Sequence, residues 1–203
     1  AERIGVNPYQ FGMIAATDIH NGAQGPVEET QAISLIGRPP SVGNNPGGRA
    51  AVWAEENSRD AIFRAIRRRE IFGTSGPRIR PRFYAGWDYP DDLCDASDLT
   101  EQGYAKGVPM GGDLPARPGD AEGPVFAVSA LRDAGAGEAP GTPLQRVQIV
   151  KGWIENGETH EKVVDVAGGK GRGRVNTATC EISGGGAERL CTVWQDEDFD
   201  ASQ

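Results

Sequence analysis

The sequence predicts an α+β fold in which a short strand-and-helix unit precedes a longer module of antiparallel strands. Glycine and proline account for 29 and 14 of the 203 residues, so turns are frequent and regular elements are short. A continuous apolar run and one amphipathic helix occupy the beginning of the chain. After Arg78, apolar and polar residues alternate, as in strands with one covered face. We therefore expect two parts, residues 1–76 and 77–203, that divide near Gly73–Gly76.

The first part begins with the apolar run FGMIAATD, residues 11–18. Its lack of alternation is typical of a strand that is buried on both faces in a parallel sheet or an α/β barrel. Such a strand needs neighbours on both sides, and the sequence before Phe11 supplies none. The chain is therefore expected to begin within a domain. If it folds on its own, residues 1–40 should be exposed, disordered or paired with another copy.

Two helices are expected between this run and the module of strands. The segment VEETQAISLIG, residues 27–37, predicts a short one. The clearer helix is capped by Asn57 and stopped by Gly73. Its apolar stripe consists of Ile62, Ala65 and Ile66. We interpret the arginines on its other side as a solvated helix face; they are Arg59, Arg64, Arg67 and Arg68.

The second part reads as a succession of strands that form an antiparallel β-sandwich or half of one. The segments LQRVQIVKGWI and HEKVVDVAG flank an Asn-Gly turn, so they predict a hairpin. The glycine-rich segment GYAKGVPMGGDLP predicts a long loop. The remaining strands are expected in RIRPRFYAGWD, VFAVSAL and RLCTVWQDEDF.

The charge balance excludes two classes of partner. The formal net charge is −8 and the isoelectric point is about 4.9. Such a surface disfavours nucleic acids and anionic membranes, which attract basic proteins. No apolar run approaches the roughly 20 residues of a membrane helix. We expect neither a nucleic-acid nor a membrane partner.

The three cysteines are Cys94, Cys180 and Cys191, and none has the CxxC spacing of a zinc or redox motif. Cys180 and Cys191 flank the turn-like segment EISGGGAERL, so a hairpin could bring them close enough for a disulfide. That bond would require an oxidising compartment and would leave Cys94 without a partner in this chain. The alternative is two separate, half-buried thiols.

Asp18 and His20 form the strongest candidate site. Residues two apart on a strand point to the same side, so the carboxylate and the imidazole would converge at the carboxyl end of the strand. That is the end at which α/β folds place their sites. This donor pair suits Zn²⁺, Mn²⁺ or Fe²⁺. The alternative is an aspartate that caps the loop and a histidine bonded to backbone.

Weaker candidates lie elsewhere. Thr74 and Ser75 could line a substrate-facing loop, although a simple connection between helix and strand is the other interpretation. His160 follows the Asn-Gly turn and is expected to be exposed and structural. The four tryptophans could form a sugar-binding platform or belong to the core; they are Trp53, Trp87, Trp153 and Trp194.

Four long segments resemble the C-terminal portion of a bacterial family of unknown function. They are FGMIAATDIHNG, GRAAVWAEENSRDAIFRAIRRREIFGTSGPRIRPRF, GYAKGVPMGGDLP and RVQIVKGWIENGETHEKVVDV. The N-terminal part of that family is similar to the PHP (polymerase and histidinol phosphatase) metallohydrolases. The resemblance implies that residues 1–76 are the end of a PHP-like barrel and that Asp18 and His20 are its last metal ligands. The metal would activate water for attack on a phosphoester or related bond.

The resemblance also implies that further ligands lie outside this chain. PHP-type sites open with an H-x-H motif, which is missing here, and His160 is the only other histidine. A catalytic zinc site normally has three protein ligands and a water, so the chain alone should be inactive. Its expected partners are a missing N-terminal part of the same protein and a second copy, bound through strand edges. The resemblance and the cysteines favour a periplasmic or secreted location. The catalytic residues cannot be named, and a non-catalytic β-module that binds a glycan or a protein is the alternative function.

Overall fold

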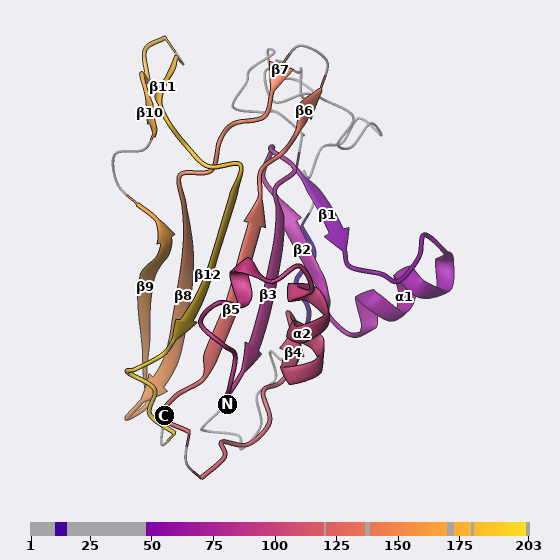
Figure 1. The fold of residues 1–203 in the computed structure, drawn as a ribbon, viewed down its shortest axis with the longest axis vertical. Coiled ribbons are helices and arrows are strands. Elements are labelled where there is room, and N and C mark those ends of the chain that lie inside the picture. The colour runs from indigo at the N-terminus through magenta and orange to yellow at the C-terminus, as the bar shows by residue number, and fades with distance from the viewer. Residues whose placement is uncertain are drawn as a thin grey trace. The chain divides into compact units, whose positions relative to one another are not determined.

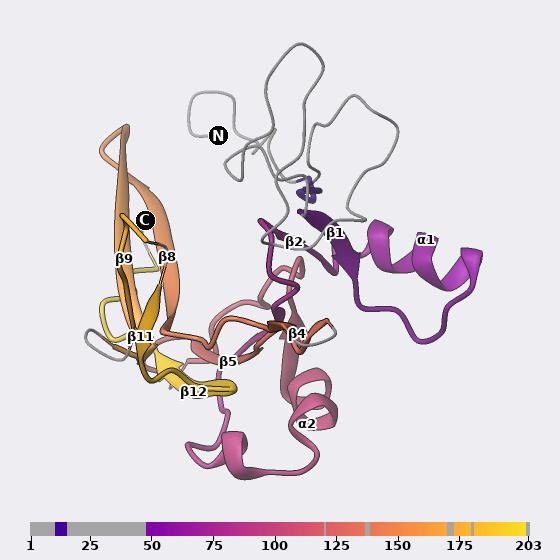
Figure 2. The same ribbon diagram turned by 90° about the horizontal axis from the view of Figure 1, so that it is seen from above.

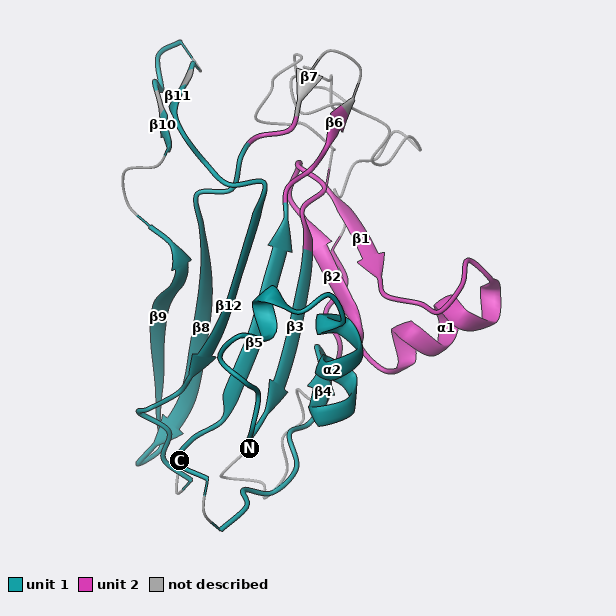
Figure 3. Ribbon diagram, viewed as in Figure 1, with its two compact units in different colours: residues 1–10, 81–131, 143–203 teal, residues 11–80, 132–142 magenta. Residues whose placement is uncertain are grey.

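The computed structural model describes residues 11–15, 48–119, 121–136, 139–169, 173–179 and 181–201 (Figure 1). The fold is mixed α+β, with few helices and mostly antiparallel strands, as the sequence predicts. Figure 3 shows two compact units. Unit 1 comprises Ala1–Gln10, Pro81–Leu131 and Pro143–Gln203, and unit 2 comprises Phe11–Arg80 and Arg132–Thr142. Within the described ranges, no helix is long and apolar enough to cross a membrane.

Unit 1 is built around a four-stranded sheet in the order β12-β5-β3-β4. β5 pairs antiparallel with β12, and β3 pairs antiparallel with β4. The strands fall in three of the predicted segments, and β4 falls in the predicted long loop. Their bounds are β3 Arg80–Gly86, β4 Gly107–Pro109, β5 Val125–Leu131 and β12 Arg189–Gln195.

One face of this sheet carries the hydrophobic core. Because side chains alternate along a strand, Tyr84 on β3 and Val125 and Ala127 on β5 point to the same side. They pack with Leu93 and Leu99, which lie on the 3-10 helix η3 (Leu93–Asp95) and the helix α2 (Leu99–Lys106). Tyr84 is 1% exposed. Figure 2 shows η3 and α2 on one side of the sheet and the β8–β9 hairpin on the other.

That hairpin consists of β8 (Arg146–Glu155) and β9 (Glu158–Gly168), paired antiparallel as predicted. The turn residues Asn156 and Gly157 have φ angles of 52° and 80°. Both values lie in the left-handed region that a two-residue Asn-Gly turn requires. A smaller hairpin in unit 1 pairs β10 (Gly173–Val175) with β11 (Ile182–Gly184).

Helix α2 corrects the prediction that GYAKGVPMGGDLP is a loop, because the helix includes the first four residues of that segment. Gly103 within α2 has a packing reason. A Cβ atom at Gly103 would stand 2.7 Å from ring atoms of Tyr84. A helical glycine costs about 1 kcal/mol relative to alanine, and here it allows the helix to pack against the Tyr84 ring.

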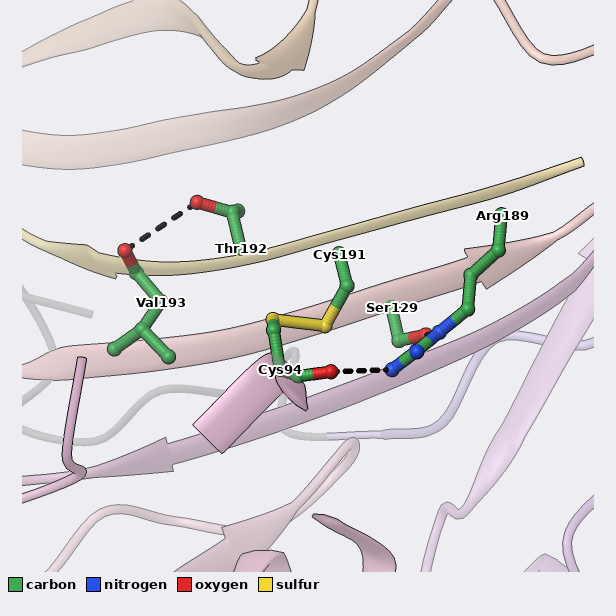
Figure 4. The surroundings of a disulfide bond; sticks show 6 residues. All are labelled: Cys94, Ser129, Arg189, Cys191, Thr192 and Val193. Carbon is green, nitrogen blue, oxygen red and sulfur yellow. Dashed lines mark hydrogen bonds between the residues drawn. A yellow bond between two sulfur atoms is a disulfide. The ribbon is translucent and has the colours of Figure 1, made fainter. Parts of the chain in front are cut away.

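The disulfide prediction is also corrected. Cys191 on β12 is bonded to Cys94 of η3, with a Cα–Cα distance of 5.7 Å, and Cys180 lies outside the described residues (Figure 4). The two cysteines are 97 residues apart, so only the tertiary fold brings them together. Beside the bond, the guanidinium of Arg189 donates to the carbonyl oxygen of Cys94 at 3.1 Å. The disulfide therefore ties η3 to the edge strand of the sheet.

Unit 2 contains the strands β1 (Arg49–Val52) and β2 (Ile71–Thr74), which pair antiparallel. Helix α1 (Arg59–Arg67) connects these two strands in the sequence. It also contains the short pair β6 (Gly135–Ala136) and β7 (Ala139–Pro140). The loop before β6 is held by Asp133, whose carboxylate accepts hydrogen bonds from the backbone N–H groups of Arg78 and Gly135 at 2.6 and 3.0 Å. These two bonds lower the pKa of Asp133.

Both predicted ends of helix α1 are wrong. The cap is Ser58, whose hydroxyl accepts a hydrogen bond from the N–H of Ala61 at 3.2 Å, and not Asn57. The helix stops well before Gly73, because Arg69 adopts a left-handed φ of 63°. The N–H groups of Arg69 and Glu70 then bond back to the last helical turn, as in a Schellman motif. Of the expected stripe, Ala65 is buried whereas Ile66 is 41% exposed.

The disulfide should contribute strongly to stability. Replacing Cys94 and Cys191 together by serine removes a link across a long loop, and we expect the free energy of unfolding in urea to fall by about 4 kcal/mol. A reductant should destabilise the wild type by a similar amount and leave the double variant unchanged. Peptide mapping without reduction should recover Cys94 linked to Cys191. Recovery of Cys191 linked to Cys180 would contradict the assignment.

Tyr89 should make the fold sensitive to alkali. Its hydroxyl donates to the carbonyl oxygen of Gly103 at 2.6 Å. Burial, together with nearby Tyr84, raises the pKa of Tyr89 from 10.0 to about 12. The neutral phenol is thus favoured in the folded state. The contribution of Tyr89 to the free energy of unfolding is therefore complete below pH 10 and is lost as the pH rises towards 12. Tyr89→Phe should flatten the pH dependence of the unfolding free energy in this window, whereas Tyr104→Phe, at a tyrosine that is 43% exposed, should not.

Candidate functional site

The predicted metal ligands Asp18 and His20 lie outside the described residues, so their convergence stays a prediction. Across the part of the chain that the structure does describe, no group of three or more His, Cys, Asp or Glu side chains could hold a metal ion. This finding does not test Asp18 and His20, because neither belongs to the described ranges.

The start of the apolar run that leads to these two residues is described. Residues 11–15 are not part of a strand, and Phe11, Met13 and Ile14 are 63%, 81% and 70% exposed. The predicted burial on both faces is wrong for these three side chains, and the exposure expected for a chain folding on its own is found for them. The segment lies against β2, where a Cβ atom on Gly73 would overlap the side chain of Ala15. Three large apolar side chains are thus mostly exposed.

The two weak substrate-binding candidates lie at the end of β2. The hydroxyl of Thr74 accepts a hydrogen bond from the backbone N–H of Arg49 at 3.0 Å. This bond joins β2 to β1, so the Thr74 side chain has a structural role in unit 2. Ser75, the next residue, is exposed.

His160 lies on β9 directly opposite Trp153 of β8, and the two rings stack with centroids 5.3 Å apart. Its Nε2 is 3.9 Å from the carboxylate of Glu155. The side chain is 36% exposed. These contacts join the two strands near their turn, which agrees with the structural role expected for this histidine.

Described residues of unit 1 line a half-open cavity of about 360 Å³. It opens on the face of the sheet opposite the core, where the β8–β9 hairpin lies. Phe83 of β3 and Phe126 of β5 line it with ring planes only 5° apart. The remaining lining residues are Ala85, Val108, Pro109, Met110, Gly111, Gly112, Leu114, Pro124, Lys151, Asp196 and Phe199. A concave, mostly apolar surface with a few polar groups is the usual form of a small-molecule site.

The charged groups of this cavity form an ion pair. The ammonium group of Lys151 lies 2.7 Å from Oδ2 of Asp196, and the two side chains are only 18% and 7% exposed. The same ammonium donates to the carbonyl oxygen of Asp198 at 3.1 Å and lies 5.6 Å from the ring centroid of Trp153. The pair therefore fixes the hairpin to the segment that follows β12.

The tryptophans are packed on other aromatic rings. Trp194 stacks on Phe126, with centroids 5.6 Å apart, and Trp87 contacts Phe199 edge to face at 5.9 Å. Trp53 lies 5.8 Å from Phe72 in unit 2. None of the four lines the cavity. All four are partly exposed and none belongs to the buried hydrophobic core, so neither interpretation of the tryptophans is confirmed.

A family model described as "Protein of unknown function (DUF3604)" matches residues 1–203, which is the whole sequence. The chain belongs to this family. No curated protein and no solved structure shows significant similarity to it. DUF3604 membership agrees with the resemblance to a family of unknown function, and the similarity to PHP metallohydrolases stays a prediction.

In this DUF3604 chain, sequence reasoning missed Lys151 and Asp196. A signal for Lys151 was present. In the alternating segment 144–154, Lys151 shares its phase with Ile149 and Trp153, which predicts a side chain on the covered face. A lysine in that position needs a buried partner. Asp196 carries no comparable signal, because the acidic run after β12 looks like an ordinary solvated end of a strand.

Removing one member of the buried pair should be costly. Lys151→Met keeps much of the apolar stem but leaves the carboxylate of Asp196 buried without its cation, and we expect a loss of about 3 kcal/mol in the free energy of unfolding. Urea denaturation would measure it.

Lys162→Met is the matched control for this substitution. Lys162 also pairs with an aspartate, Asp198, but both side chains are more than half exposed. Because solvent screens such a pair, this variant should unfold at nearly the same urea concentration as the wild type. Equal losses in the two variants would contradict the structural importance of the buried pair.

Proposed function

We propose that this DUF3604 chain is the C-terminal part of a metal-dependent hydrolase of the PHP-like type, in which Asp18 and His20 are metal ligands. The observation that carries the proposal is the solvent exposure of the apolar side chains just before them. Phe11, Met13 and Ile14 are mostly exposed, although large apolar side chains in such a run are normally covered. The last strand of a barrel would be covered by the strands that precede it, so a preceding part of the same protein is the proposed cover.

The donor set fits a divalent metal. One carboxylate and one imidazole suit Zn²⁺, Mn²⁺ or Fe²⁺, and the remaining ligands would come from the preceding part of the protein. When bound, such a metal lowers the pKa of a coordinated water and so supplies a nucleophile at neutral pH. Asp18 and His20 would hold the ion at the end of the apolar run. Attack on a phosphoester or a related bond is the proposed reaction.

Unit 1 is, on this proposal, an accessory module attached to the hydrolase. A periplasmic or secreted location is proposed with it, because structural disulfides persist mainly in oxidising compartments. The Cys94–Cys191 bond within the unit supports this location.

A second candidate function is a non-catalytic module that recognises a glycan or a partner protein. The cavity of unit 1 favours it, because every described residue that lines the cavity belongs to that unit. The two candidates differ in whether Asp18 and His20 matter.

The metal content of the purified, full-length gene product tests the hydrolase proposal. Asp18→Ala and His20→Ala should each lower the bound Zn, Mn or Fe per chain several-fold, measured by inductively coupled plasma mass spectrometry, because each removes one ligand. Hydrolysis of bis-p-nitrophenyl phosphate, used as a probe phosphoester, should fall with the metal. His160→Ala is the matched control and should change neither quantity, since His160 packs on Trp153 in the hairpin. Unchanged metal content in both Asp18→Ala and His20→Ala would overturn the proposal and favour the binding module.

A further inference from the structure

We propose that the cavity of unit 1 binds a small neutral molecule that has an apolar ring and one hydroxyl group. The residues that carry this inference belong to unit 1 alone. The inference is therefore independent of the metal site proposed at Asp18 and His20, and failure of one proposal would not affect the other.

The size and the lining of the cavity favour an apolar ring. Its volume of about 360 Å³ lies at the lower end of the range of roughly 300–1,000 Å³ that is usual for ligand pockets. Phenylalanine rings line it from three places in the unit: Phe83 on β3, Phe126 on β5 and Phe199 after β12. Met110 and Leu114, from the loop after β4, add aliphatic surface. Burial of a ring of ligand size against these side chains would supply the main driving force for binding.

The lysine in the cavity is not available to bind an anion. An ammonium group has three N–H donors. The ammonium group of Lys151 lies 2.7 Å from Oδ2 of Asp196, donates to the carbonyl oxygen of Asp198 at 3.1 Å and lies 5.6 Å from the centroid of the Trp153 ring. A ligand carboxylate or phosphate would have to displace one of these contacts and would also approach the carboxylate of Asp196.

Asp196 supplies the polar contact for a ligand. Its side chain is 7% exposed and lines the cavity. The ammonium group of Lys151 is placed against Oδ2, and we assign Oδ1 as the oxygen that meets a ligand. A carboxylate accepts at both oxygens, so Oδ1 can accept a hydrogen bond from a hydroxyl group of the ligand. Because Lys151 already balances the charge of Asp196, the cavity favours a neutral ligand.

The test compares phenol with toluene, which has a similar ring but no hydroxyl group. Each is titrated into the full 203-residue chain, and the dissociation constant is taken from amide chemical shifts. In a wholly apolar cavity, the buried hydroxyl of phenol would lose its hydrogen bonds to water and phenol would bind more weakly than toluene. With Oδ1 of Asp196 as acceptor, phenol should bind at least as tightly as toluene. Benzoate should bind at least tenfold more weakly than phenol, because its charge meets Asp196.

A matched pair of variants locates the binding. Leu114→Trp places a larger side chain in the cavity and should abolish the shifts caused by phenol, whereas Leu114→Met conserves volume and should retain them. Phenol binding more weakly than toluene, equal binding of benzoate, or binding of phenol to Leu114→Trp at wild-type strength would overturn the proposal. Methyl glucoside is titrated in the same way. Chemical-shift changes with this sugar but not with phenol would show a glycan site and would also overturn the proposal.

Discussion

The two-residue alternation of side chains along β3 and β5 is the constraint on which unit 1 depends. It sends Tyr84 to one face of the sheet and Phe83 to the other, so the sheet is apolar on both faces and each face needs a cover. η3 and α2 cover the Tyr84 face, and the disulfide from Cys94 secures η3 to β12. The β8–β9 hairpin provides the second cover, beside the cavity. The cavity is thus a consequence of how the second face is covered.

The contact that holds the β8–β9 hairpin in place is ionic and not apolar. Lys151 reaches from the inner side of β8 to Asp196, just after β12, and both side chains are largely buried. A buried ion pair gives little net stability over apolar packing, because both charges lose their hydration. The ion pair does restrict the register of the hairpin. If β8 shifted by one residue, Lys151 would point outward and Asp196 would lose its cation. The same pair leaves one carboxylate oxygen at the cavity, which connects the architecture of the unit to the proposed ligand.

The two proposals place different functions in two parts of the chain. The proposed metal ligands follow an apolar segment in unit 2, and the proposed ligand cavity belongs to unit 1. A hydrolase with an accessory module of this kind would have chemistry in one part and recognition of a small molecule in the other. The DUF3604 match extends over both parts, so both belong to the family's shared sequence.

Local patterns in the sequence were sufficient for the elements whose physics is local. Alternation placed β3 and β8, and the Asn-Gly dipeptide placed the hairpin turn and the partner strand β9, because strand periodicity and turn geometry depend on neighbouring residues. The segments of β5 and β12 were also recognised as strands. The assignment of Asp18 and His20 as metal ligands stays a prediction, because both residues lie outside the described part of the chain. The ends of α1 were missed, because Ser58 competed with Asn57 as a cap and Arg69 adopted a left-handed conformation that non-glycine residues rarely take.

What only the tertiary structure decided involves residues far apart in the chain. Helix α2 contains a glycine that local propensity disfavours, and it is stabilised by packing against Tyr84. Cys191 has Cys180 close in sequence, yet it bonds Cys94, because the fold brings η3 against β12. Asp196 becomes a buried partner of Lys151 only when the hairpin lies over the sheet. The sequence by itself determined the strands β3, β5, β8, β9 and β12, the turn and the charge of the molecule. The core, the disulfide and the cavity were decided by the tertiary structure, because each depends on contacts between segments that local sequence patterns do not relate.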